Sequence, residues 1–307
     1  MEYIVGSRGS ALALAQTQWV IDRLQAAYPQ HRFSVAVITT RGDRILDRPL
    51  DQVGGKGIFV REIEQQLLDG AIQMAVHSLK DMPAAPPEGL CYTRFWRRQD
   101  PREALVLAKP AAFPAASPLA ALPQGASVGT GSKRRIAQLL ALRPDLRPAP
   151  IRGNVGTRIE KMHAQGMDGL VLAAAGLRRL EMENQIAFLL DPDQFVPAPG
   201  QGTLALEVAA ENTELRAMLD SLSDPETHLC AAAERAFLAR VDGGCHLPVG
   251  AYCRLEGNRA VMTGLLGSAD GGFVGWQRGQ APAAQAEQLA LELADRLLAR
   301  RKEACGQ

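Results

Sequence analysis

Two segments rich in glycine and arginine are the first candidates for chemistry in this chain. Gly129–Arg135 reads Gly-Thr-Gly-Ser-Lys-Arg-Arg, and Arg152–Arg158 reads Arg-Gly-Asn-Val-Gly-Thr-Arg. Each follows an expected strand and begins an expected helix, whose N-terminus offers unpaired N–H groups and a partial positive charge. Glycine lets the backbone approach a ligand, and arginine matches carboxylate or phosphate oxygens. Together they predict a cleft for a ligand with several negative charges; two ordinary turns with solvated arginines are the alternative.

A carboxylate after a buried strand is the second candidate. Asp81 lies in Ser78-Leu79-Lys80-Asp81, directly after the expected strand Met74–His77. Ligands of open α/β sheets bind at the carboxyl ends of strands, where a carboxylate can accept N–H groups or stabilise a developing cation. The alternative role of Asp81 is that of a turn residue before Pro83, and His77 is expected to be a satisfied strand histidine.

Cys245 is the third candidate, because two glycines precede it and a proline turn follows. A thiol on such a bent loop suits a nucleophile or an attachment point, and an inert thiol is the alternative. No metal site is expected, because the spacing of the neighbouring ligand types fits no compact pair of pairs: His228, Cys230, Cys245, His246 and Cys253.

The composition is that of an ordinary globular protein. Of 307 residues, 47% are hydrophobic and 22% are charged, and the formal net charge of +1 favours neither nucleic acid nor a membrane as a partner. No secretory signal pattern and no apolar run of about 18 residues is visible. Five irregularly spaced cysteines indicate a reducing compartment. A cytoplasmic protein is therefore expected.

Strands and helices are expected to alternate over the first two thirds of the chain, which predicts α/β layers. Ser10 is expected to cap a helix over 11–27 that turns Leu14, Val20, Ile21 and Leu24 toward the core. The C-terminal residues predict a separate α+β part, with a helix from Pro225 to Arg240, an antiparallel meander and a final helix over 283–301. Gly42–Gly57 is long for a connection, and we expect it to be poorly ordered without ligand and to act as a lid; a plain flexible loop without a catalytic part is the alternative.

The order of these motifs resembles that of the porphobilinogen deaminase (hydroxymethylbilane synthase) family. The resemblance covers nearly the whole chain, and Thr40–Asp43 with Gly54–Gly57 is similar to the family's loop over the site. Five motifs carry it in order: Val76–Pro83, Gly129–Arg135, Arg152–Arg158, Pro199–Gly202 and Gly243–Cys245.

The resemblance implies two doubly wound α/β domains like those of periplasmic solute-binding proteins, plus a small α+β C-terminal domain with an antiparallel sheet. Domain 1 would comprise 1–98 and 197–219, with the loop and the catalytic carboxylate. Domain 2 would comprise 99–196, with the arginine-rich segments, and domain 3 would comprise 220–307, with the cysteine loop.

The resemblance also implies an activity, in which four porphobilinogen molecules are joined head to tail with loss of ammonia on a covalent dipyrromethane cofactor. Asp81 would be the catalytic carboxylate, and Cys245 would carry the cofactor through a thioether. The other cofactor-binding positions would be Ser78, Lys80, Asp81, Thr130, Ser132, Arg134 and Arg135. The substrate-binding positions would be Arg8, Ser10, Gln16, Phe59, Arg152, Gly153, Arg158, Arg179 and Gln201.

Three positions depart from the family's usual residues without removing a charged or covalent participant. Gly131 stands where serine is common, Ala11 where proline is frequent, and His246 with Leu247 where Gln and Val are frequent. The resemblance further implies a monomer that hands its product to uroporphyrinogen-III synthase. Two alternatives remain: a non-catalytic solute-binding protein for a polyanion, and a phosphate-handling enzyme, which the missing Gly-x-x-x-x-Gly-Lys-Ser/Thr pattern disfavours.

Overall fold

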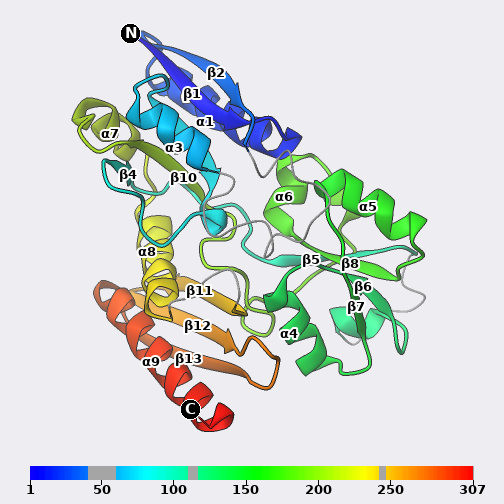
Figure 1. Ribbon diagram of the computed structural model, residues 1–307. Helices are drawn as coiled ribbons and strands as arrows, with labels where there is room; N and C mark the ends of the chain where they lie inside the picture. Colours follow the sequence, from blue (N-terminus) through cyan, green and yellow to red (C-terminus); the bar gives the residue numbers. More distant parts are fainter. Residues whose placement is uncertain (41–59, 110–116, 242–246, 307) are drawn as a thin grey trace. The chain divides into compact units, whose positions relative to one another are not determined.

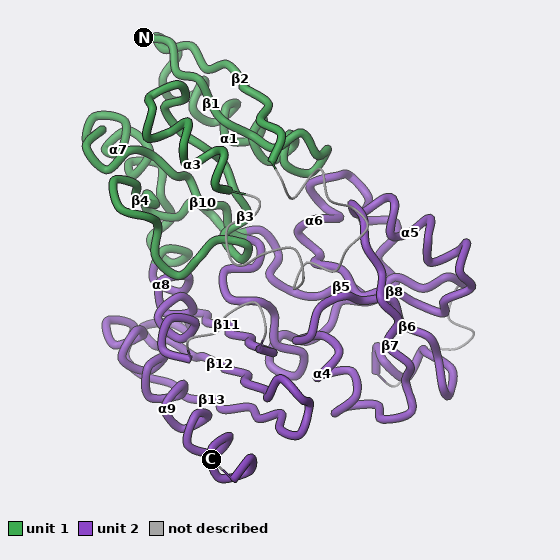
Figure 2. Tube along the Cα trace, in the orientation of Figure 1, with its two compact units in different colours: residues 1–98, 203–228 green, residues 99–202, 229–307 purple. Residues whose placement is uncertain are grey.

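The computed structural model describes residues 1–40, 60–109, 117–241 and 247–306. The chain forms two compact units, which Figure 2 shows in different colours. Unit 1 comprises Met1–Arg98 and Thr203–His228, and unit 2 comprises Gln99–Gly202 and Leu229–Gln307. The expected division into three domains stays a prediction. Within the described ranges, no helix is long and apolar enough to cross a membrane.

Unit 1 is built on a five-stranded sheet with the order β2-β1-β3-β10-β4 (Figure 1). Strand β1 runs parallel to β2 and β3, whereas β10 runs antiparallel to β3 and β4. The strands are β1 (Glu2–Arg8), β2 (Arg32–Ile38), β3 (Met74–Ser78), β4 (Leu90–Tyr92) and β10 (Leu204–Ala209). The helices are α1 (Ala11–Ala27), α3 (Arg61–Leu68), the 3-10 turn η1 (Leu79–Asp81) and α7 (Thr213–Asp220).

Helices cover both faces of this sheet, which explains why β3 reads as a continuous buried run. On one face Met74 and Val76 pack with Val20 and Leu24 of α1. On the other face Ala75 packs with residues of α3, including Ile63. The carboxyl end of β3, with η1, is therefore positioned by packing on two sides.

Unit 2 contains two sheets. The first has the order β7-β6-β8-β5-β9, with β6 parallel to β7 and β8 and with β5 antiparallel to β8 and β9. Its strands are β5 (Glu103–Leu107), β6 (Ser127–Gly129), β7 (Arg147–Ala149), β8 (Gly169–Ala173) and β9 (Phe188–Leu189). Its helices are α4 (Lys133–Leu142), α5 (Val155–Ala164), α6 (Ala174–Arg179) and the 3-10 turns η2 (Pro118–Ala121) and η3 (Glu183–Gln185). The sheet repeats the strand arrangement of unit 1, although the sequence shows no internal repeat.

The second sheet of unit 2 is the antiparallel meander β11-β12-β13. Its strands are β11 (Val249–Glu256), β12 (Arg259–Gly267) and β13 (Val274–Pro282), joined to η4 (Ala283–Gln285) and α9 (Ala286–Cys305). Helix α8 (Pro225–Arg240) contributes Phe237 to the same core, and α9 contributes Leu293. Figure 1 shows α9 lying along this sheet.

The expected fold class is confirmed: two α/β sheets covered by helices and a separate antiparallel sheet. The helix capped by Ser10 spans Ala11–Ala27, as predicted, and α8 begins at Pro225. One core expectation is wrong, because Leu14 is 36% exposed while Gln16 and Thr17 are buried.

Candidate functional site

The 3-10 turn η1 presents Asp81 at the carboxyl end of β3 in unit 1. Leu79 is fully buried and its N–H donates to the Thr203 carbonyl at 3.0 Å, and the Met82 N–H closes the turn on the Leu79 carbonyl at 3.1 Å. The Asp81 side chain is exposed and has no hydrogen bond or ion pair within the described residues. A firmly held turn thus carries a carboxylate that is open to a ligand, with the half-buried Lys80 beside it.

Gln16, expected to contact the substrate, and Ser78, expected to contact the cofactor, lie in contact next to this turn. Gln16 is 3% exposed, and its Nε2 donates to the Ser78 Oγ at 3.0 Å. This contact explains why Gln16, rather than Leu14, faces the sheet. Ser10 accepts a hydrogen bond from the Ala13 N–H at 3.3 Å, so its hydroxyl also caps α1. Arg8 ends β1 and is half-buried.

A buried polar pair that the sequence did not indicate lies behind the turn. His77 Nε2 is 3.2 Å from Glu207 Oε2, without the geometry of a hydrogen bond, and the two side chains are 5% and 0% exposed. Burial raises the pKa of the nearby Glu64 carboxyl, the charge of Glu207 raises it further, and His77 and Arg61 oppose the shift. His77 is therefore a buried strand residue beside a carboxylate.

In unit 2, the first glycine–arginine segment is open at the start of α4. Ser132 is the residue before the helix, and its hydroxyl makes no capping hydrogen bond to the first turn. Thr130 is 1% exposed, and its Oγ1 accepts from the Ser132 N–H at 3.2 Å. Since a helix N-terminus without a side-chain cap keeps N–H groups for other acceptors, this segment is suited to an anion.

Arg134 and Arg135 are buried and share one carboxylate, that of Glu103. Arg134 Nη2 donates to Glu103 Oε1 at 2.5 Å, and Arg135 Nη2 donates to Oε2 at 2.7 Å. Their second nitrogens donate to the carbonyls of Val196 and Val171. Burial lowers the pKa of Arg134, and the Glu103 charge opposes that shift. The guanidinium groups of Arg134 and Arg135 and the carboxylate of Glu103 together carry one net positive charge, and all three side chains are buried.

The second segment differs from the first because its helix is capped from within. Asn154 Oδ1 accepts from the Thr157 N–H at 2.9 Å and so closes the start of α5. Gly153 has a φ of 121°, which favours glycine, and its carbonyl accepts from Arg158 Nε at 2.7 Å. Arg152 is half-buried, and its carbonyl accepts from Lys161 Nζ at 3.1 Å. Asn154 therefore occupies one of the N–H groups that this helix start could offer to an anion.

Arg179 and Gln201 lie near the segment that ends at Gly202, all within unit 2. Arg179 Nη2 donates to the Gly202 carbonyl at 2.7 Å, and no acidic side chain pairs with it in the described part of the chain. Burial lowers the pKa of Arg179 to about 10, which leaves it charged at neutral pH. Gln201 is fully buried and donates to the Pro101 carbonyl at 2.8 Å.

Three expectations fall outside the described residues: Cys245, Phe59 and the loop Gly42–Gly57. Among the residues that are described, no group of three or more His, Cys, Asp or Glu side chains could hold a metal ion. Glu103 and Glu207 cannot be recognised from the sequence, because an isolated glutamate in a strand gives no signal of its partner.

Comparison with known proteins gives two family matches that together span most of the chain. Residues 3–217 match "Porphobilinogen deaminase, dipyromethane cofactor binding domain", and residues 228–299 match "Porphobilinogen deaminase, C-terminal domain". The porphobilinogen deaminase of Clostridium novyi is 45% identical over 301 residues, 97% of this chain and 99% of that protein. That of Roseiflexus sp. is 48% identical over 296 residues, 96% of this chain and 95% of that protein.

Solved structures with a similar chain path include two periplasmic proteins. The VFT2 domain of Bordetella pertussis BvgS has a TM-score of 0.44 at 18% identity, covering 72% of this chain and 86% of that one. The periplasmic aliphatic sulphonate binding protein of Escherichia coli has a TM-score of 0.40 at 14% identity, covering 78% of this chain and 70% of that one.

Proposed function

The chain belongs to the porphobilinogen deaminase family, and we propose how its residues divide the work of that family's reaction. It is a transferase that joins four porphobilinogen molecules head to tail, with loss of ammonia, on a covalent dipyrromethane primer. Hydrolysis then releases the linear tetrapyrrole hydroxymethylbilane. The observation that carries this conclusion is the family match over residues 3–217 and 228–299, and it disfavours a non-catalytic solute-binding protein.

The start of α4 fits the acid side chains of a dipyrromethane. The helix has no side-chain cap, Glu103, Arg134 and Arg135 together carry a net positive charge, and the Nε of Arg135 is buried without a hydrogen-bond partner. A carboxylate bound here would supply an acceptor and the missing negative charge. We therefore assign Thr130, Ser132, Arg134 and Arg135, with Ser78 and Lys80 of unit 1, to holding the cofactor, and Cys245 to its attachment.

The bound dipyrromethane supplies the pyrrole carbon to which porphobilinogen is joined, and Asp81 acts on porphobilinogen itself. Its exposed, unpartnered carboxylate can accept the pyrrole N–H and stabilise the cation that forms as ammonia leaves. The short turn η1, fixed through Leu79, holds the backbone of Asp81 in one place during successive additions. Preorganisation of this kind lowers the barrier because the charge need not be assembled at the moment of reaction.

The remaining arginines are assigned to the carboxylates of porphobilinogen and of the growing chain. Each pyrrole unit carries an acetate and a propionate, so negative charge accumulates with every addition. Arg179 supports the assignment best, because it stays charged, is half-buried and has no acidic partner in the described residues. Arg8, Arg152 and Arg158 extend this set, with Ser10, Gln16, Phe59, Gly153 and Gln201 contributing polar or ring contacts.

We further propose that the protein works as a cytoplasmic monomer and passes its product to uroporphyrinogen-III synthase. Free thiols at Cys91, Cys230, Cys253 and Cys305 support a reducing compartment.

The assignment of Asp81 is tested by Asp81→Asn, which keeps the side chain's size and removes its charge. Turnover should fall about 10²- to 10⁴-fold, the range of a positioned acid–base group, while the intact mass still shows the bound dipyrromethane. The matched control is Asp22→Asn, an exposed residue of α1 whose carboxylate accepts from Gln18, and its turnover should be normal. Turnover of Asp81→Asn close to that of the control would remove Asp81 from its role.

The assignment of Cys245 is tested by the intact mass of Cys245→Ala. An unmodified mass would support the attachment of dipyrromethane to Cys245, whereas a retained dipyrromethane would refute it.

A further inference from the structure

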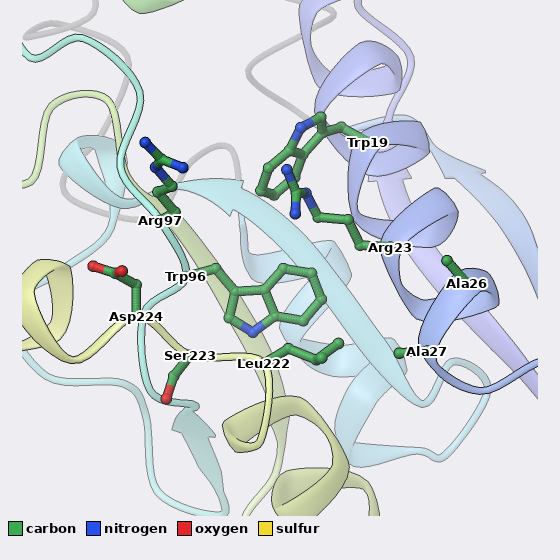
Figure 3. Close-up of a pocket in the computed structure, with 9 residues that line it drawn as sticks. All are labelled: Trp19, Arg23, Ala26, Ala27, Trp96, Arg97, Leu222, Ser223 and Asp224. Carbon is green, nitrogen blue, oxygen red and sulfur yellow. The ribbon is translucent and has the colours of Figure 1, made fainter.

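An open depression on unit 1 is lined by aromatic rings that the protein itself covers (Figure 3). Arg23 lies over the Trp19 ring, with its guanidinium carbon 4.2 Å from the ring centre. Trp96 is 4% exposed, and its indole N–H donates to the Leu219 carbonyl at 2.8 Å. The contacts that bear further on function lie instead in unit 2.

Residues 191–197 of unit 2, here called the bridging segment, connect helix α4 with the sheet β11-β12-β13. The segment follows β9, and its last three residues, Phe195, Val196 and Pro197, are buried. On the α4 side, Phe195 packs in one apolar cluster with Leu139. Buried polar groups of the backbone need partners, so the hydrogen bonds of this segment show what it holds together.

Gln138 of α4 binds the bridging segment as a neighbouring strand would. Its Oε1 accepts from the Val196 N–H at 2.6 Å, and its Nε2 donates to the Val196 carbonyl at 3.0 Å, so one carboxamide pairs with one peptide group. The side chain is fully buried and lies one helical turn after Arg134, whose Nη1 donates to the same carbonyl at 2.7 Å. The position of Val196 therefore also affects the orientation of the Arg134 guanidinium group.

The other side of the bridging segment is bound to β11 and β12. The Ala251 N–H of β11 donates to the Pro197 carbonyl at 3.1 Å. Arg254 Nη1 donates to Asp193 Oδ2 at 2.9 Å, and Thr263 Oγ1 donates to Asp193 Oδ1 at 2.7 Å. Helix α4 and strand β11 are thus hydrogen-bonded to adjacent peptide units of one short segment.

We propose that Gln138 is a positioning residue for the dipyrromethane, an inference that rests on the function proposed above. Through the bridging segment, Gln138 fixes the start of α4, which is assigned to the acid side chains of the cofactor, relative to β11. Strand β11 begins at Val249, shortly after the attachment position Cys245. A molecule held at two places binds well only when the distance between the two places matches it.

This alignment matters most before the cofactor is attached. Once attached, the cofactor itself connects Cys245 with the arginines of α4 and so replaces part of the connection through Val196. The loss of Gln138 should therefore slow the attachment of the cofactor more than it slows the turnover of protein that already carries it. A residue that only stabilised the fold would not separate these two rates.

The test measures attachment and turnover separately. The full-length chain is produced in a host that makes no porphobilinogen, incubated with porphobilinogen, and followed by intact mass until the dipyrromethane is attached. Gln138→Met keeps the length of the side chain and removes both hydrogen bonds to Val196. Attachment should slow about tenfold, the effect of roughly one net hydrogen bond, whereas turnover of the fully loaded variant should fall much less.

Two matched controls separate positioning from lost stability and lost charge. Leu297→Ala removes a fully buried side chain from the core of α8, α9 and the sheet, and its attachment rate should equal that of the unaltered protein. Asp193→Asn weakens the other side of the bridging segment and should slow attachment about threefold. Asp295→Asn breaks an ion pair with Arg240 at 2.6 Å, outside the bridging segment, and should not slow it.

Attachment at the unaltered rate in Gln138→Met and Asp193→Asn would overturn the inference. Equal slowing by Gln138→Met and Leu297→Ala would overturn it too, as would a loss of turnover in loaded Gln138→Met as large as its loss in attachment rate. If Gln138→Met does not fold, the comparison of Asp193→Asn with Asp295→Asn decides alone. An unaltered chain that gains no mass would instead remove the proposed function, and this inference with it.

Discussion

Glu103→Gln is the substitution that best tests the buried arginine pair of unit 2. Glu103 is fully buried and faces both Arg134 and Arg135, whose side chains are 7% and 8% exposed. The amide keeps the size of the side chain but leaves two buried guanidinium groups without a counter-charge. Removing one partner of a buried ion pair costs about 3–5 kcal/mol, and we expect a loss of that order in the free energy of unfolding.

The loss in the free energy of unfolding caused by Glu103→Gln should depend on whether the cofactor is attached. Burial already lowers the pKa of Arg134 and Glu103 opposes that shift, so the loss of Glu103 removes a favourable interaction of the charged form. If the cofactor's acid side chains lie against the same arginines, they supply part of the missing negative charge. The loss should therefore be larger in the Cys245→Ala background than in the cofactor-bearing protein.

The assay is urea unfolding, with the midpoint and the slope determined for both backgrounds. Asp145→Asn is the matched control, because Asp145 pairs with Arg143 at 2.7 Å but the two side chains are 25–30% exposed. Its effect should be much smaller, since solvent screens such a pair. Equal losses for Glu103→Gln and Asp145→Asn would refute the reasoning about burial. Equal losses of Glu103→Gln in both backgrounds would refute the contact between the arginines and the cofactor.

Two further substitutions test the framework of unit 2. Burial raises the pKa of Asp100, but hydrogen bonds from Arg102 outweigh it and hold the pKa below the usual 3.8, so Asp100→Asn should lower stability at pH 7. The difference in stability between Asp100→Asn and the unaltered protein should disappear as the pH falls through the lowered pKa of Asp100. Thermal unfolding at a series of pH values measures it, and a difference that persists in acid would contradict the role of the Asp100 charge. Gly202→Ala should cost more than Gly257→Ala. Both glycines have a positive φ, but a Cβ at Gly202 would meet the Gln99 carbonyl oxygen, whereas a Cβ at Gly257 would meet no atom within 4 Å. Equal unfolding midpoints of the two variants would contradict this steric argument.

Local signals in the sequence predicted the elements that they govern directly. Ser10 and Pro225 mark the starts of α1 and α8, because a hydroxyl cap and a proline in the first turn act within a few residues. The exposed position of Asp81 also follows from a local signal, because it comes shortly after a buried strand, where the carboxyl end of the sheet exposes side chains, and its catalytic role stays a prediction. Such signals depend on near neighbours in the chain.

Signals that depend on distant residues were missed. Glu103 lies about thirty residues before Arg134 and looks like any strand glutamate until β5 and α4 pack together. Leu14 was placed in the core by its apolar character, yet Gln16 occupies that face through a hydrogen bond to Ser78, 62 residues away. Periodicity identifies a helix, whereas polar partners across the sheet decide its rotation.

The two glycine–arginine segments share a sequence pattern but differ in local structure. Both follow a strand and begin a helix, and both have an extended cap residue, at Ser132 and Asn154. The Asn154 amide oxygen occupies the first-turn N–H of its own helix, while the Ser132 hydroxyl leaves its helix uncapped. The first segment can therefore offer its first-turn N–H groups together with buried arginines, whereas in the second segment Asn154 already occupies the Thr157 N–H and the arginines are half-buried. This difference supports the proposed division, in which the first segment holds the fixed cofactor and the second contacts the growing chain, because side-chain contacts adjust more readily than a helix terminus.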